Sequence, residues 1–146
     1  MTRQEELINT FLVEVFNDVL HLEEASLMRS GCKNLTVSEM HVLEAVQKGE
    51  HDETMSELAA RLHVTASTLT VAVKTLEQKG YLVRQRATDD RRKVTVHLTQ
   101  PARDALRHHA GFHQELVAQV STQLPPEQMK ALTQALECLH QYFSGL

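Results

Sequence analysis

Residues 54–98 constrain the fold most, because two short amphipathic segments are followed at once by two alternating ones. Thr54-Met-Ser-Glu57 has the pattern of a capping box, which predicts the start of a short helix. His63-Val64 predict a tight turn, and Thr65 caps a second helix that ends at Lys79-Gly80. Two short helices joined by a tight turn form a helix-turn-helix.

The segments that follow this motif predict a hairpin. Residues 81–86 and 94–98 alternate between apolar and polar side chains, with Val94, Val96 and Leu98 on one face of the second segment. Residues 87–93 between them are polar and charged. We therefore expect a β-hairpin, called the wing below, directly after the second helix.

Long amphipathic segments flank this region. Residues 4–30 carry an apolar residue every three or four positions up to Gly31, and Thr36-Val-Ser-Glu39 predicts a helix over 37–48. Two more helices are expected over 99–120 and after Pro125-Pro126. The apolar seam of the last helix is too long for one small domain to cover, and it consists of Met129, Leu132, Leu136, Leu139 and Phe143.

These elements predict a mainly α fold with a small β-hairpin, organised as one domain over residues 1–146. Residues 36–98 form the winged helix-turn-helix, and residues 1–35 and 99–146 form long N- and C-terminal helices that hold a homodimer together. Helices with exposed apolar faces need a partner surface, and a second copy of the chain supplies one.

The charge is divided unevenly along the chain. The formal net charge is -4, but residues 54–98 hold eight Lys/Arg against four Asp/Glu, so that segment carries +4 and the remainder -8. Binding to phosphate needs a local positive field, because more distant charges are screened at physiological salt. The middle third of the chain is therefore the candidate nucleic-acid surface.

Several other classes of protein are disfavoured. No run of eighteen apolar residues could span a bilayer and the N-terminus lacks a secretion signal, so we expect a cytoplasmic protein with no membrane partner. The chain has no GxSxG, no HExxH and no glycine-rich phosphate loop, which argues against an enzyme. Cys32 and Cys138 fit no CxxC spacing and are expected to be reduced, although a Cys32-based oxidation sensor stays open as an alternative.

Asp90-Arg91-Arg92, followed by Val94-Thr-Val-His-Leu-Thr99, resembles the wing signature of the MarR family of transcriptional regulators, and the order of elements resembles that family over the whole chain. The resemblance implies that Asp90 holds Arg92 in place and that Arg92 enters the minor groove of DNA. A narrow minor groove attracts arginine, because its negative potential is enhanced. Arg91 and Lys93 would then contact phosphates.

The second helix of the motif would read the major groove, because its exposed side chains are short. Hydroxyl and methyl groups let a helix approach base edges closely. Thr65 is also expected to cap the helix, and Lys74 is the expected phosphate partner. The predicted DNA contacts are Thr65, Ser67, Thr68, Thr70, Lys74, Arg86, Arg91, Arg92 and Lys93.

A second resemblance concerns the effector. Phe16-Asn-Asp-Val-Leu, Ser38-Glu-Met-His41 and Leu76-Glu-Gln-Lys-Gly-Tyr81 are similar to the FabT-type repressors of fatty-acid-synthesis genes. This resemblance implies a repressor that long-chain acyl-acyl carrier protein strengthens as corepressor. An acyl chain would need an apolar channel, whose candidate lining is Leu20, Leu27, Met28, Met40, Leu43 and Phe112.

The histidines indicate a second possible effector. His109 and His113 are four residues apart, a spacing that lets two imidazoles on one helix face bind one metal ion. With Glu24 and His41 they resemble the Zn2+ site of the zinc-uptake repressors of the same family, in which zinc acts as corepressor. A second site is not expected, because Met40 and His108 replace carboxylates. Exposed histidines, or a buried hydrogen-bonded Glu/His group, remain the alternatives.

Overall fold

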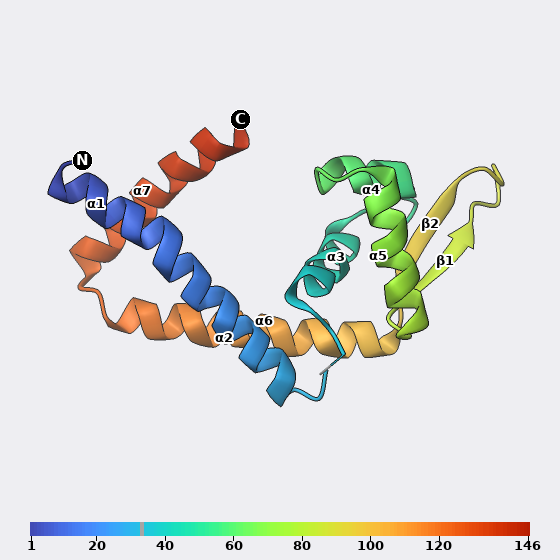
Figure 1. Ribbon diagram of the computed structural model, residues 1–146, viewed down its shortest axis with the longest axis horizontal. Helices are drawn as coiled ribbons and strands as arrows, with labels where there is room; N and C mark the ends of the chain where they lie inside the picture. The colour runs from blue at the N-terminus through green and yellow to red at the C-terminus, as the bar shows by residue number, and fades with distance from the viewer. Residues whose placement is uncertain (33) are drawn as a thin grey trace. The chain divides into compact units, whose positions relative to one another are not determined.

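Figure 1 shows the computed structural model of the chain, in which residues 1–32 and 34–146 are described. It forms two compact units, residues 1–110 and 111–146. The fold is mainly helical with one two-stranded antiparallel sheet, as predicted. Over the described residues, every helix is too short or too polar to cross a lipid bilayer. The elements in order are α1 (Arg3–Thr10), the π-helical η1 (Phe11–Val15), α2 (Phe16–Arg29), α3 (Val37–Lys48), α4 (Met55–Arg61), α5 (Ala66–Gln78), β1 (Leu82–Arg86), β2 (Val94–Leu98), α6 (Gln100–Thr122) and α7 (Pro126–Ser144).

The predicted capping boxes are confirmed. At α3, the Glu39 backbone N–H donates to Thr36 Oγ1 and the Thr36 N–H donates to Glu39 Oε2, both at 3.1 Å. Thr54 and Glu57 make the same pair of bonds at the start of α4. These bonds satisfy backbone donors that the first turn of a helix leaves without partners. They fix where both helices begin.

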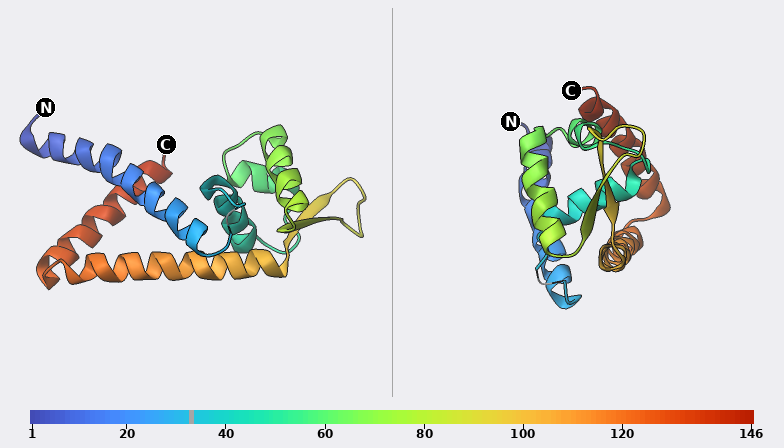
Figure 2. Two further views of the ribbon diagram at one scale, coloured as in Figure 1. Left: turned by 60° about the horizontal axis from the view of Figure 1, so that its bottom comes forward. Right: turned by 90° about the vertical axis from the view of Figure 1, so that its right-hand side faces the viewer.

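One hydrophobic core supports the helix-turn-helix. Met40 and Leu43 of α3 and Val73 and Leu76 of α5 have no exposed surface, and the side chain of Leu82 at the start of β1 packs with them. Helix α5 therefore buries one face completely. Its other face and the wing are held in a fixed relation by this core, and Figure 2 shows the tip of the wing projecting away from the helices.

Polar contacts hold the same unit together around the core. Lys79 Nζ lies 2.8 Å from Glu39 Oε2, and the Tyr81 hydroxyl donates to Asn34 Oδ1 at 2.8 Å. Burial, and then the nearby thiol of Cys32, raises the pKa of Tyr81 above its usual value, so this hydroxyl keeps its proton at neutral pH. Cys32 itself is a half-buried free thiol, whereas Cys138 is an exposed one.

The turn of the motif contains backbone strain. His63 has a φ of 56°, the one positive value at a residue other than glycine among those that the structure describes. A side chain in this left-handed region costs about 1–2 kcal/mol, which glycine avoids. His63→Gly should therefore raise the free energy of unfolding by up to about 1 kcal/mol, once the extra freedom of glycine in the unfolded chain is subtracted. Unfolding of the protein by urea measures this change.

His63→Ala is the matched control, because alanine keeps the β-carbon and loses the same imidazole. It should give no stabilisation. Equal stability of the glycine and alanine variants would contradict the strain at this turn.

Candidate nucleic-acid interface

Helix α5 presents a row of small side chains. Ser67, Thr68, Thr70 and Lys74 are exposed along it, opposite the buried Leu69, Val73 and Leu76. Because the buried face packs in the core, the opposite face of α5 is left open to contact a ligand. A helix with short hydroxyl-bearing side chains and one lysine suits close approach to base edges and a phosphate.

The first turn of α5 is ordered by Thr65. Its Oγ1 accepts from the Thr68 backbone N–H at 3.1 Å and donates to Thr68 Oγ1 at 2.8 Å. Thr70 Oγ1 donates to the Ala66 carbonyl at 2.8 Å, so its proton is used within the helix and its lone pairs stay available. Thr65 thus acts as the N-cap, as expected, and Thr70 is placed to accept.

Strand pairing and hydrogen bonds to Asp90 order the charged tip of the wing. Strands β1 and β2 pair from Leu82 with Leu98 to Arg86 with Val94. At the tip, the Arg92 backbone N–H donates to Asp90 Oδ1 at 3.0 Å, and the Lys93 N–H donates to the Asp90 carbonyl at 3.0 Å. Asp90 therefore orders the backbone at Arg92 through this hydrogen bond.

The cations of residues 54–98 fall into two sets, those that pair with a carboxylate and those that do not. Arg61 pairs with Glu53, Lys79 with Glu39, and Arg84 with Glu77 at 2.5 Å. The hydrogen bond to Glu53 is the main reason why the pKa of Arg61 is raised above its usual value. Within residues 1–32 and 34–146, no carboxylate lies within ion-pair distance of the remaining cations of residues 54–98, which are Lys74, Arg86, Arg91, Arg92 and Lys93.

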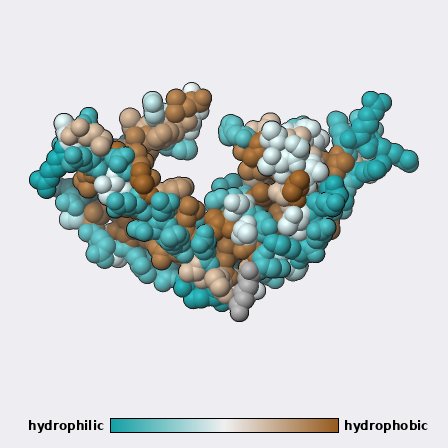
Figure 3. Space-filling model, viewed as in Figure 1, coloured by the Kyte–Doolittle hydropathy of each residue, from teal (hydrophilic) through white to brown (hydrophobic). Residues whose placement is uncertain are grey.

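These unpaired cations are all exposed, and they are those predicted to contact DNA. Helix α5 and the wing line a common hollow of about 540 Å3. Its lining includes Thr70 of α5 and Arg92 and Lys93 of the wing. Figure 3 shows the tip of the wing as strongly hydrophilic. A surface with several cations that lack ion-pair partners attracts phosphates.

Sequence reasoning missed the contribution of α4 to this surface. Thr54 and Ser56, at the start of α4, line the same hollow as Thr70 and Arg92. Thr54 also bridges to Thr95 of β2, which ties the start of α4 to the wing. The capping box identified Thr54 as a helix start, but no sequence signal linked it to the hairpin.

The predicted metal ligands are gathered only in part. The ligand atoms of Glu23, His109 and His113 all lie within 4.8 Å of one another, so His109 and His113 come together and Glu23 takes the place of Glu24. The side chain of His109 is 4% exposed and its Nε2 lies 2.7 Å from Glu44 Oε1 and 3.8 Å from Glu23 Oε1. Glu24 is exposed, and His41 lines a different hollow with Leu62 and Val64. His113 is half-buried one turn further along α6, in the second unit.

The periodicity of α2 contained a signal for Glu23. It follows Leu20 by three residues and precedes Leu27 by four, which is the spacing of a buried face. Glu44 carried no comparable signal. Two imidazoles and one carboxylate are donors that zinc accepts, so the chemistry of Glu23, His109 and His113 fits, while the set differs from Glu24, His41, His109 and His113.

The predicted acyl-channel residues have different environments. Leu27, Met40 and Leu43 are buried in the core, and Leu20 packs against it while partly exposed. Met28 is 63% exposed. Phe112 is half-buried in the second unit. The first four residues thus have a structural role in the core whether or not a ligand binds.

The fold and this surface define a winged helix-turn-helix protein that binds DNA. A sequence profile of the MarR family matches residues 33–93. Transcriptional regulator AdcR of Streptococcus pneumoniae is 31% identical over 138 residues, covering 90% of this chain and 92% of that protein. The chain therefore belongs to the MarR family of transcriptional regulators, which are not enzymes.

Two further relatives resemble the chain over most of its length. The structure of Streptococcus pneumoniae FabT in complex with DNA has a TM-score of 0.89 and 34% identity, covering 97% of this chain and 98% of that one. Transcriptional regulator ZitR of Lactococcus lactis is 26% identical over 112 residues, covering 75% of this chain and 76% of that protein. The likeness to FabT covers both the helix-turn-helix and the long terminal helices.

Proposed function

We propose that this chain is a cytoplasmic homodimeric repressor that reads a short pseudo-palindrome in front of fatty-acid-synthesis genes, with long-chain acyl-acyl carrier protein as corepressor. The observation that carries the DNA-binding part is the division of the cations. Arg61, Lys79 and Arg84 are paired with carboxylates. Lys74, Arg86, Arg91, Arg92 and Lys93 are exposed without such partners among the described residues.

The fatty-acid part is supported by the likeness to FabT over almost the whole chain. In the dimer we propose, residues 1–35 and 99–146 supply the contact between subunits, and residues 36–98 supply the contact with DNA. Each recognition helix would enter one major-groove half-site, and each wing would place Arg92 in the adjacent minor groove.

A zinc-responsive repressor of metal-uptake genes is the second candidate. The observation that favours it is the group of Glu23, His109 and His113, whose ligand atoms lie within 4.8 Å of one another, with Glu44 Oε1 2.7 Å from His109 Nε2. Ligands on α2, α3 and α6 would link the helices that we assign to dimerisation with the helix-turn-helix. Zinc bound there would supply a structural cross-link, and it would favour one spacing of the recognition helices. Without metal, His109 Nε2 contacts Glu44 Oε1 at 2.7 Å.

Operator binding with each effector separates the two candidates. An operator is first selected from random DNA, and its affinity is then measured with hexadecanoyl-acyl carrier protein, with unacylated carrier protein, and with zinc sulfate after removal of metal by a chelator. We expect the acylated carrier protein alone to tighten binding at least about tenfold, a coupling of typical size. Tightening by zinc alone would overturn the fatty-acid assignment and support the second candidate.

His109→Gln is the matched variant for this experiment. It should abolish any response to zinc, and the response to acylated carrier protein should persist. Failure of the wild-type protein to select any DNA sequence would contradict the proposed function itself.

A further inference from the structure

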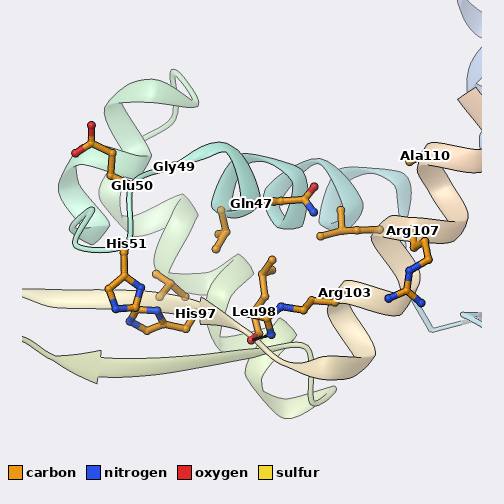
Figure 4. Close-up of a pocket in the computed structure, with 12 residues that line it drawn as sticks. Gln47, Gly49, Glu50, His51, His97, Leu98, Arg103, Arg107 and Ala110 are labelled. Atoms are coloured by element: carbon orange, nitrogen blue, oxygen red, sulfur yellow. Dashed lines mark hydrogen bonds between the residues drawn. The ribbon is translucent and has the colours of Figure 1, made fainter. Parts of the chain in front are cut away.

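A separate hollow lies between the end of α3, the loop that follows it, strand β2 and the first turns of α6 (Figure 4). Its volume is about 600 Å3, within the range of small-molecule sites. It contains neither the predicted DNA contacts nor the Glu23/His109 group. Its apolar lining is made by Val46, Val96, Leu98, Leu106 and Ala110.

The polar lining of this hollow consists mainly of donors. Gln47, His51, His97, Arg103 and Arg107 line it, and Glu50 is the one acidic residue among its twelve lining residues. In Figure 4 the carboxylate of Glu50 points away from the two imidazole rings. The side chains around the hollow therefore favour a ligand that accepts hydrogen bonds and carries negative charge.

Arg103 is held in place by the protein. Its Nη1 donates to the Leu98 carbonyl at 2.9 Å, which keeps the guanidinium beside the apolar lining. No carboxylate of a described residue lies within ion-pair distance of Arg103. Arg107 follows one helical turn later, and its own pairing with Asp104, at 3.3 Å, is between two largely exposed side chains. Exposed pairs of this kind are weak, so Arg107 is available to a ligand.

Two histidines in the lining of the hollow lie close together. The rings of His51 and His97 lie 4.8 Å apart, and His97 Nε2 is 2.9 Å from Thr95 Oγ1. Burial, and then the neighbouring His51, lowers the pKa of His97. An anion in the hollow would supply a counter-charge that favours a proton on His97.

We infer that this hollow binds a small organic anion with an apolar body. A carboxylate or phosphate head would contact Arg103 and Arg107, and a chain of a few carbons would cover Val96, Leu98 and Leu106. Inorganic phosphate alone would leave this apolar lining uncovered. The inference is independent of the proposed corepressor, because none of these residues belongs to either effector site considered above.

Calorimetric titration with hexanoate, hexyl phosphate and 1-hexanol at constant ionic strength tests the inference. At least one of the two anions should bind at concentrations below about 10 mM, and 1-hexanol should bind at least about tenfold more weakly, because hydrogen bonds to charged groups are worth that much or more. The imidazole NMR signals of His51 and His97 should shift with the same affinity. The tighter of the two anions identifies the head group.

Arg103→Gln and Arg107→Gln should each weaken anion binding about tenfold, with Arg91→Gln at the tip of the wing as the matched control. Arg107→Gln keeps the test valid if loss of the Leu98 contact disturbs the fold of the Arg103 variant. Three results would overturn the inference: equal weakening by Arg91→Gln, equal affinity for 1-hexanol, or binding that leaves both histidine signals unmoved.

Discussion

Replacing Arg92 with alanine should weaken operator binding by about 1–3 kcal/mol for each wing, or about 5- to 150-fold per half-site. Arg92 is exposed, has no ion-pair partner among the described residues, and lines a hollow with Thr70 of the recognition helix. Its backbone is ordered by Asp90, so little additional ordering is needed when DNA binds. Fluorescence anisotropy with the selected operator, at one fixed salt concentration, measures the change.

Two variants show whether the effect is specific. Lys74→Ala should weaken binding to operator and to unrelated DNA alike, and should reduce the salt dependence by a slope of about 0.9 for one phosphate contact. Arg29→Ala, which removes an exposed arginine at the end of α2, should leave affinity unchanged. Wild-type affinity of the Arg92 variant would refute the role assigned to the wing.

The sequence predicted the elements well where the signals are local. Capping boxes at Thr36 and Thr54 fixed the starts of α3 and α4, and the alternation of residues 94–98 identified β2. Apolar spacing also identified the long N-terminal helix, but not that it contains the π-helical segment η1. A π-helical turn depends on a hydrogen bond shifted by one residue, which side-chain periodicity does not reveal.

The site was predictable only in part, because ion pairs join residues far apart in sequence. The charge count of residues 54–98 treated all eight cations alike, and only the fold separates Lys79, paired with Glu39, from Arg92. Contacts between residues far apart in sequence also explain why the predicted metal ligands differ from the residues that the fold brings together. Rotation of one helix by a single residue decides between Glu23 and Glu24, and the meeting of Glu44 with His109 is a tertiary contact.

The proposed contact between two subunits gives the second large expected effect. In the single chain, apolar side chains of α1, η1 and α2 are left uncovered, with Phe11 55% and Phe16 63% exposed. The apolar seam of α7 is likewise open to solvent, which Figure 3 shows as brown surface towards the C-terminus. Soluble monomers rarely expose large apolar patches, so these uncovered side chains argue for a partner subunit.

Phe16→Asp should therefore dissociate the dimer, because a carboxylate buried in an apolar interface loses its hydration without a partner. Each subunit would then bind its half-site of the operator on its own, and operator affinity should fall at least about 100-fold. Light scattering after size-exclusion chromatography measures the mass, and anisotropy measures the affinity. Asn17→Asp, which adds the same charge at the next, already polar position, should leave both unchanged. A Phe16→Asp protein that remains a dimer would show that residues 1–35 do not form the contact, and Leu139→Asp on α7 would then test whether the C-terminal helix does so alone.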